Sequence, residues 1–208
     1  MALKRTSSQA EPQQAEATTG DHLAQELQGA EASGRRLAAR GLANHPDYWQ
    51  VLLERLPCET DHSVREALFC SLESLGGQAV VDGLIELLRS DEAHLRNGAI
   101  EVLQAQPEFT GQRIDQLLQD TDSDVRIFAI DILQTLVHPR APQWLRQIFQ
   151  HEEHPNVLGA AVDRATEIGD PSMREDLLNL RTRVADTPYL VFAIDLALKR
   201  IGEQADEG

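Results

Sequence analysis

The strongest constraint on this chain is a five-residue pattern that returns about every thirty residues. Three clear copies begin at positions 64, 95 and 125 and read Val-Arg-Glu-Ala-Leu, Leu-Arg-Asn-Gly-Ala and Val-Arg-Ile-Phe-Ala. Weaker copies begin at positions 34, 157 and 190, so that successive copies start 30, 31, 30, 32 and 33 residues apart. A fixed period of this length, filled with helical patterning, is the signature of stacked helical hairpins. The sequence therefore predicts an all-α protein, an α-solenoid of about six hairpins.

Apolar spacing within each copy supports this architecture. Counted from the first residue of the pattern, apolar side chains return at offsets of four, eight and eleven, as in Leu68, Leu72 and Leu75. This spacing keeps one stripe of a helix facing inward over three turns. Every proline from Pro46 onward falls at a junction between expected helices, where no helical hydrogen bond is lost. The expected hairpins span about residues 21–44, 47–75, 77–106, 111–138, 141–169 and 171–203.

The two ends of the chain lack this pattern. Residues 1–20 are rich in Ser, Thr, Gln, Glu and Ala and contain almost no large apolar side chain. Such a segment cannot offset the entropy lost on ordering, so we expect a disordered tail. The repeat domain is expected over residues 21–203, and residues 204–208 are expected to be flexible.

The charge balance restricts the classes of partner. With 34 acidic and 19 basic residues, the formal net charge is −15. This balance argues against nucleic acids and anionic membranes as partners, because both are bound through Lys and Arg. A protein with a basic surface fits better. No secretory h-region and no apolar run of about 18 residues is visible, so we expect a cytoplasmic protein without a membrane span.

A second regularity surrounds the pattern: an acidic residue three positions before it and an arginine at its second position. The two clearest examples read Asp61-His-Ser-Val-Arg65 and Asp122-Ser-Asp-Val-Arg126. This arrangement resembles the HEAT repeat, and most of all the short bacterial HEAT-like type also found in phycobilin lyases. The resemblance covers about residues 31–203. It implies a stack of hairpins and leaves the function open, because such folds host many roles.

These acidic and basic residues have a structural explanation. An aspartate at this position can cap the second helix of a hairpin, and the arginine can meet an acidic turn residue of its own or the adjacent hairpin. We therefore predict a ladder of paired charges, made by Asp61, Arg65, Glu92, Arg96, Asp122 and Arg126. The last two copies carry Leu158 and Val191 in place of the arginine, so the ladder is expected to end after the fourth hairpin.

Two short motifs could suggest metal binding. Asp120-Thr-Asp122-Ser-Asp124 resembles the start of a calcium loop, but it lacks the glycine at the sixth loop position and the closing glutamate. His151-Glu-Glu-His154 straddles an expected helix end, which favours a solvated turn. No nucleophile elbow or phosphate-binding glycine loop is present. We therefore predict no catalytic residue, no metal site and no cofactor.

Acidic residues also recur six positions after the start of the pattern. Glu101, Asp131 and Asp163 occupy this position, and Asp195 lies near it in the last copy. In a stack of this type the second helices line the concave face, with equivalent positions about 10 Å apart. The sequence thus predicts a row of carboxylates along one groove. The row is either a binding site for a basic protein surface or an ordinary hydrated helix face.

Three functions can be proposed for a chain with this repeat. The first is a non-catalytic scaffold that binds a partner protein through the concave acidic groove. The second is implied by the resemblance alone, because HEAT-like phycobilin lyases attach or detach bilin chromophores. The third is a HEAT-like DNA-repair glycosylase, which needs a basic groove and is disfavoured by the charge of −15.

Overall fold

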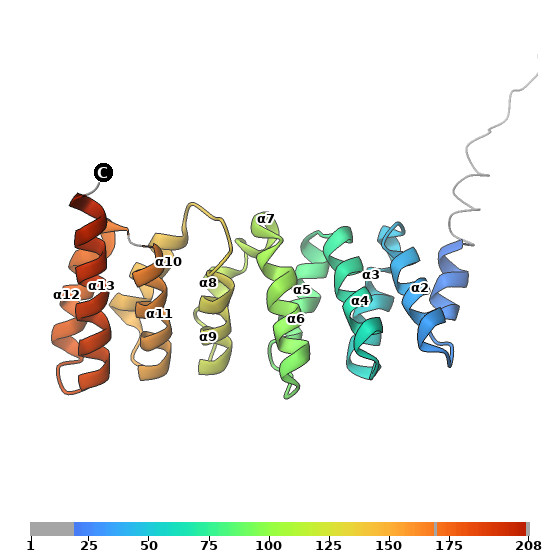
Figure 1. Cartoon of the computed structure of the whole chain (residues 1–208), viewed down its shortest axis with the longest axis horizontal. Helices are drawn as coiled ribbons and strands as arrows, with labels where there is room; N and C mark the ends of the chain where they lie inside the picture. Colours follow the sequence, from blue (N-terminus) through green and yellow to red (C-terminus); the bar gives the residue numbers. More distant parts are fainter. Residues whose placement is uncertain (1–18, 169, 207–208) are drawn as a thin grey trace, which may run out of the picture. The chain divides into compact units, whose positions relative to one another are not determined.

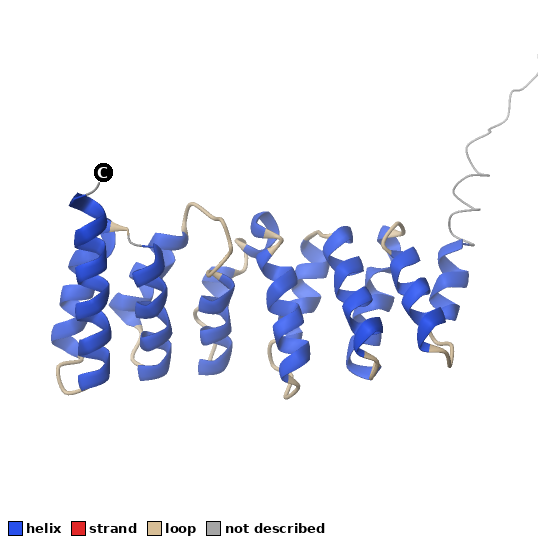
Figure 2. Cartoon of the chain, in the orientation of Figure 1, coloured by secondary structure: helices blue, strands red, loops and turns tan. Residues whose placement is uncertain are grey.

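The computed structural model describes residues 19–168 and 170–206, with side chains described up to residue 202. All regular elements in this part of the chain are helices, and the fold is an all-α solenoid (Figure 2). The chain divides into two compact units, the first ending at Val102 and the second beginning at Leu103. Within the described ranges, no helix is both long and apolar enough to cross a membrane.

The first unit begins with a helix over residues 19–26. It continues with α2 (Ala32–Leu42), α3 (Trp49–Arg55), α4 (His62–Leu75), α5 (Gln78–Leu87) and α6 (Ala93–Gln104), and short 3-10 helices η1 (Pro46–Tyr48) and η2 (Leu56–Cys58) flank α3 (Figure 1). The second helices of neighbouring hairpins pack together, as α2 does against α4. Helix α3 packs between α4, its partner in the hairpin, and α5, the next first helix.

The second unit repeats this plan. Its elements are α7 (Pro107–Thr110), α8 (Ile114–Leu117), α9 (Ser123–Ile132), α10 (Ala141–His151), α11 (Pro155–Ile168), η3 (Pro171–Met173), α12 (Arg174–Arg183) and α13 (Pro188–Asp206) (Figure 1). Helix α11 lies against both α9 and α13, and α10 lies against α11 and α12. The first helices and the second helices thus form two parallel series.

The six predicted hairpins are present, and the fourth departs from the expected form. Its first half consists of two four-residue helices, α7 and α8, in place of one continuous helix. Pro107 starts α7, and Gly111 follows it where a Cβ would come within 2.8 Å of the Pro107 carbonyl oxygen. The buried Thr110 hydroxyl donates to the Leu103 carbonyl at 2.8 Å and so holds the short turn against the end of α6. The predicted tails stay predictions: residues 1–18 lie outside the described part, and α13 is helical to Asp206.

The inward stripe predicted from apolar spacing forms the core. Leu68 and Leu72 are fully buried in α4, and the equivalent Ala129 and Leu133 are buried at the end of α9. Cys70, in contrast, is exposed. It lies six residues after Val64 and therefore on the side of α4 that faces away from the stripe, while its neighbour Phe69 is buried.

One glycine allows a close approach between second helices. A Cβ on Gly98 of α6 would lie 2.3 Å from Cε2 of Phe69 on α4. Gly34 in α2 is the opposite case, because nothing lies within 4 Å of a Cβ there. The two glycines are therefore a matched pair for separating helix propensity from packing.

We expect Gly34→Ala to raise the free energy of unfolding by about 0.5–1 kcal/mol, because alanine is the better helix former. Gly98→Ala gains the same propensity but must displace the buried Phe69 ring, so we expect a net loss of about 1–2 kcal/mol. Urea unfolding followed by circular dichroism measures both changes. Equal stabilisation by the two variants would contradict the packing argument.

Candidate functional site

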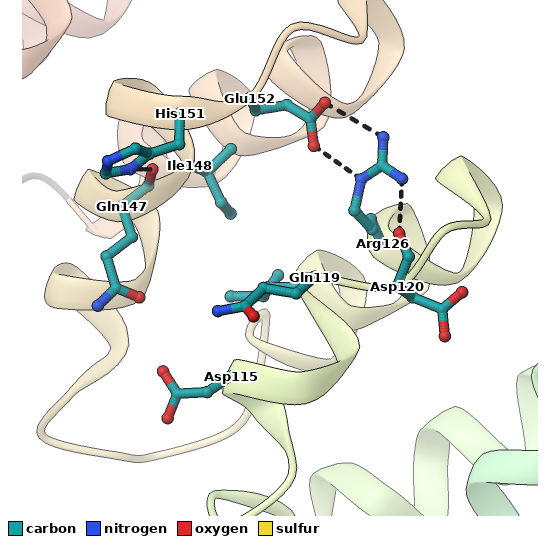
Figure 3. Close-up of a pocket in the computed structure, with 9 residues that line it drawn as sticks. Asp115, Gln119, Asp120, Arg126, Gln147, Ile148, His151 and Glu152 are labelled. Carbon is teal, nitrogen blue, oxygen red and sulfur yellow. Dashed lines mark hydrogen bonds and ion pairs between the residues drawn. The ribbon is translucent and has the colours of Figure 1, made fainter.

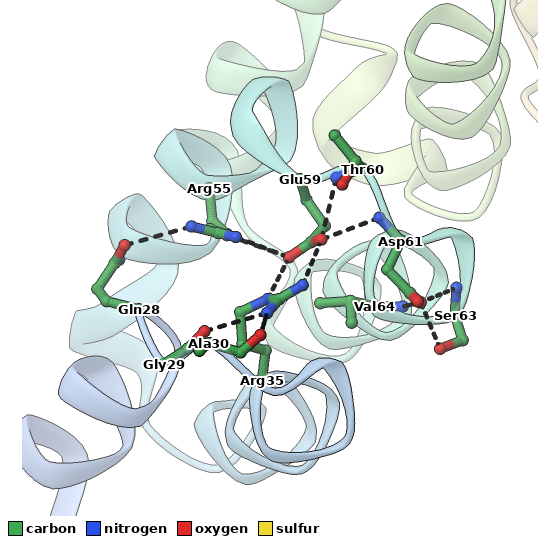
Figure 4. Close-up of polar contacts among 10 residues, drawn as sticks. All are labelled: Gln28, Gly29, Ala30, Arg35, Arg55, Glu59, Thr60, Asp61, Ser63 and Val64. Atoms are coloured by element: carbon green, nitrogen blue, oxygen red, sulfur yellow. Dashed lines mark hydrogen bonds and ion pairs between the residues drawn. The ribbon is translucent and has the colours of Figure 1, made fainter.

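A buried carboxylate joins three elements of the first unit (Figure 4). Glu59, which has no exposed side-chain surface, lies in the turn before α4. Its Oε2 accepts from Arg35 Nε of α2 at 2.7 Å and from Arg55 Nη2 of α3 at 2.9 Å. Its Oε1 accepts from Arg35 Nη2 at 2.9 Å and from the backbone N–H groups of Thr60 and Asp61 at 3.0 and 2.9 Å. The carboxylate therefore holds α2, α3 and the start of α4 together.

These contacts change the ionisation of Glu59. The hydrogen bond from Arg35, together with the Asp61 N–H and Arg55, lowers the pKa of the carboxyl to about 2 against the opposing effect of burial. A carboxylate so strongly held in its charged form is a structural group rather than a proton donor.

The same arrangement returns around other arginines at the second position of the pattern. Arg126 donates from Nε and Nη2 to Glu152 at 2.7 and 3.1 Å, and from Nη1 to the Asp120 carbonyl at 2.8 Å. Arg35 and Arg96 likewise donate to the carbonyl six residues before them, at 3.0 and 2.6 Å. Each arginine thus closes the turn of its own hairpin, and Arg35 and Arg126 also reach a glutamate of the next one.

The acids that pair with these arginines are not all the acids of the predicted ladder. Arg65 pairs with Glu92 at 2.9 Å, in the next hairpin. Asp61 and Asp122 instead cap their helices: Asp61 Oδ1 accepts from the N–H groups of Ser63 and Val64, and Asp122 Oδ1 accepts from Asp124 N–H.

Sequence reasoning missed Glu59 and Glu152. Each lies two residues before the position where we placed the acid, and this shared offset is the signal that could have identified them. Leu158, which replaces the arginine in the fifth hairpin, is buried at 2% exposure. An apolar contact therefore takes the place of the ion pair there.

An open pocket of about 630 Å³ lies between α8, the turn after it, and α10 (Figure 3). Asp115 and Gln119 form one wall, Gln147 and His151 the other, and the Arg126–Glu152 pair closes one end. The remaining lining residues are Leu118, Asp120 and Ile148.

The Asp115 wall is held by a tryptophan and an arginine. Asp115 Oδ1 accepts from the indole Nε1 of the fully buried Trp144 at 3.1 Å, and Oδ2 lies 2.9 Å from Arg140 Nη2. The Arg140 guanidinium lies over the Trp144 ring, 5.0 Å from its centroid. The carboxylate is therefore preorganised beside an apolar surface. Carboxylate and amide oxygens on both walls can accept hydrogen bonds from the N–H groups of a ligand.

The predicted acidic row is divided between the two units. Glu101 belongs to the first unit, and the other three residues belong to the second. Glu101 and Asp163 are exposed, while Asp131 is half-buried and burial raises the pKa of its carboxyl against the opposing charge of Arg164. Asp195 forms a two-point ion pair with Arg181, at 2.6 and 3.1 Å. The residue in register with the row in the last hairpin is its neighbour Leu196.

No group of three His, Cys, Asp or Glu side chains able to hold a metal ion occurs within residues 19–168 and 170–202. In the two short motifs that could suggest metal binding, the acidic side chains accept hydrogen bonds from backbone N–H groups instead. Asp120 Oδ1 accepts from Asp122 N–H at 2.9 Å, and Glu152 Oε1 accepts from the N–H groups of Glu153 and His154 at 3.0 and 2.8 Å.

The lowered pKa of Glu59 predicts a dependence of stability on pH. Because the folded pKa is about 2 against an ordinary value of 4.5, the carboxylate contributes about 3 kcal/mol that is fully present above about pH 4.5 and is lost as the pH falls toward 2. We expect Glu59→Gln to destabilise the protein at neutral pH. We also expect the free energy of unfolding of this variant to fall less steeply as the pH is lowered. Urea midpoints between about pH 6 and pH 3 measure this. The exposed Glu54→Gln should behave as the parent protein; if both variants keep the parent's acid slope, Glu59 is not its source.

Comparison with known proteins defines the family. The model for HEAT repeats matches residues 20–104 and 112–203. Over 126 residues, 59% of this chain, the sequence is 29% identical to the bilin biosynthesis protein PecE of Nostoc sp. and 30% identical to that of Mastigocladus laminosus. The aligned part is 49% and 46% of those proteins, so the chain spans about half the length of the curated relatives it matches.

One solved structure agrees with the fold. Cex1p has a TM-score of 0.51 at 11% identity, covering 93% of this chain and 44% of Cex1p. The complex of CpcE and CpcF of phycocyanin lyase from Nostoc sp. has a TM-score of 0.38 at 15% identity, covering 97% of this chain and 100% of the matched one. The repeat period, the paired helices and the family match lead to one conclusion: this chain belongs to the HEAT repeat family.

Proposed function

We propose that this chain handles a bilin chromophore. The observation that carries the proposal is the 29–30% identity over 126 residues to two bilin biosynthesis proteins. The fold alone would not support it, because helical-repeat scaffolds host many unrelated functions.

The pocket between α8 and α10 is the site we propose for the chromophore. Its volume of about 630 Å³ lies within the usual range for small-molecule sites, about 300–1,000 Å³. A bilin is an open-chain tetrapyrrole with pyrrole N–H donors along an apolar conjugated system. The carboxylate of Asp115 and the side-chain oxygens of Gln119 and Gln147 can accept from such donors, while Leu118 and Ile148 offer apolar contact.

Filling this pocket should weaken bilin binding. We expect titration of the purified protein with biliverdin to change the visible absorption spectrum, and Gln147→Trp to weaken binding at least about tenfold by occupying the space. The control is Gln143→Trp, which places the same side chain at an exposed position on the same helix outside the pocket lining. Equal affinity of the two variants would exclude the pocket, and an unchanged spectrum with the parent protein would exclude bilin binding.

We propose as a second function that the chain is a non-catalytic scaffold for a partner protein with a basic surface. Exposed Glu101 and Asp163 support it, together with the formal net charge of −15. Complementary charge favours encounter with a basic surface and disfavours acidic ones. The two functions are compatible, because none of the residues of the acidic row lines the pocket.

Charge reversal tests the scaffold function. Replacing Glu101, Asp131 and Asp163 together by Lys should abolish capture of the partner from native cell extract while the circular dichroism spectrum stays helical. The control reverses Glu54, Glu86 and Glu108, three exposed acids on first helices, and changes the net charge equally. If both triple variants lose the partner, net charge alone explains the binding; if neither does, the acidic row has no part in it.

A further inference from the structure

The last hairpin exposes apolar side chains to an unusual degree. Four of the six large apolar residues exposed in the described part of the chain belong to α12 and α13. They are Leu178, Tyr189, Phe192 and Leu196, and Phe192 is 73% exposed. Exposed apolar groups that cluster in this way mark binding surfaces more often than scattered ones do.

Helical spacing places Tyr189, Phe192 and Leu196 on one face of α13, because residues three and four apart are neighbours on a helix surface. The buried stripe of α13 runs through Leu190 and Ile194. Phe192 and Leu196 are two positions further along the chain than these two residues, which turns them to the other side of the helix. The core therefore does not cover them.

Comparison with α11 shows that a further hairpin stacked on α13 would leave the position of Leu196 exposed. In α11, which has a second helix on each side, the residues that correspond to Val191 and Asp195 are Leu158 and Val162, and both are buried. The residue that corresponds to Leu196 is Asp163, and it remains exposed despite both neighbours. Leu196 therefore points across the series of second helices and not along it, and Phe192 shares its face of α13 one turn earlier.

The same two positions on each neighbouring second helix carry one uncharged residue and one acid. Helix α11 contributes Gly159 and Asp163 next to Phe192 and Leu196, and α9 contributes Ile127 and Asp131. We call the surface of these six residues the α9–α13 face: Ile127, Asp131, Gly159, Asp163, Phe192 and Leu196. Asp163 is exposed and Asp131 is half-buried, and Gly159 adds no side chain to this face of α11.

We propose that the α9–α13 face binds an amphipathic helix of another polypeptide. Apolar residues of that helix contact Phe192 and Leu196, and its Lys or Arg residues lie beside Asp131 and Asp163. Charge disfavours a second copy of this chain as the occupant, because each copy carries −15. This inference rests on the scaffold function proposed above and names the apolar anchors that charge alone does not supply.

Three synthetic helical peptides of about 18 residues, five turns, test the proposal. One carries Leu on one face and Lys on the other, the second replaces Leu by Ser, and the third replaces Lys by Glu. We expect the Leu/Lys peptide to bind the full chain at least about tenfold more tightly than the other two, measured by fluorescence anisotropy. Equal binding of the Leu/Lys and Ser/Lys peptides would overturn the proposal, because charge alone would then account for it.

Variants locate the binding. The double change Phe192→Ser and Leu196→Ser should weaken Leu/Lys binding at least about tenfold, and Leu196→Ser alone should weaken it less. The matched control changes Leu37 and Val137, also exposed and apolar but outside the face, to Ser. Circular dichroism verifies that each variant is folded. We expect folded variants, because the substituted side chains are exposed.

The outcomes separate this inference from the function it rests on. If the Ser variants bind as the parent does while the charge-reversed variant does not bind, the apolar anchors are wrong and the scaffold function stands. If charge reversal and the Ser variants are both without effect, both proposals fail. If sedimentation shows a dimer of the parent that the Phe192→Ser and Leu196→Ser variant loses, the occupant is a second copy and the proposal is overturned.

Discussion

The first, second and fourth hairpins of this protein each carry an arginine that joins their turn to the next hairpin. Arg35 and Arg126 donate to a carbonyl six residues earlier and, with their remaining donors, to Glu59 and Glu152 of the following hairpin. A planar guanidinium suits this task because it serves two acceptors in fixed directions at once. Removing one partner would leave a buried or half-buried charge uncompensated, which is costly in a protein interior.

Because these ion pairs lie at the turns, the first helices and the second helices both keep surfaces that are available for binding. In the second unit, the space between the first helices α8 and α10 is the open pocket, whose Asp115 is held by Trp144 and Arg140. The second helices α9, α11 and α13 carry the carboxylates and the exposed Phe192 and Leu196. A small molecule and a partner protein could therefore be bound by the same hairpins at separate places.

Sequence reasoning succeeded where a residue's role depends on its own helix. The inward position of Leu68 and Leu72, the capping by Asp61 and the six hairpins all follow from spacing along the chain. It failed where the role depends on a neighbouring hairpin. Glu59 differs from an ordinary turn glutamate only by the offset that it shares with Glu152, because its burial depends on Arg35 of the preceding hairpin. Asp195 was assigned to the acidic row, but its neighbour Leu196 holds that register and Asp195 pairs with Arg181.

The sequence by itself determined the repeat, the helical pairs and the family, because a period of about thirty residues with one apolar stripe has few other solutions. Only the tertiary structure decided which charges are paired and which surfaces remain open. Side chains distant in sequence, such as Asp115 and Trp144, meet through the stacking of hairpins. The distances between such side chains depend on how the helices pack, which local sequence patterns do not specify.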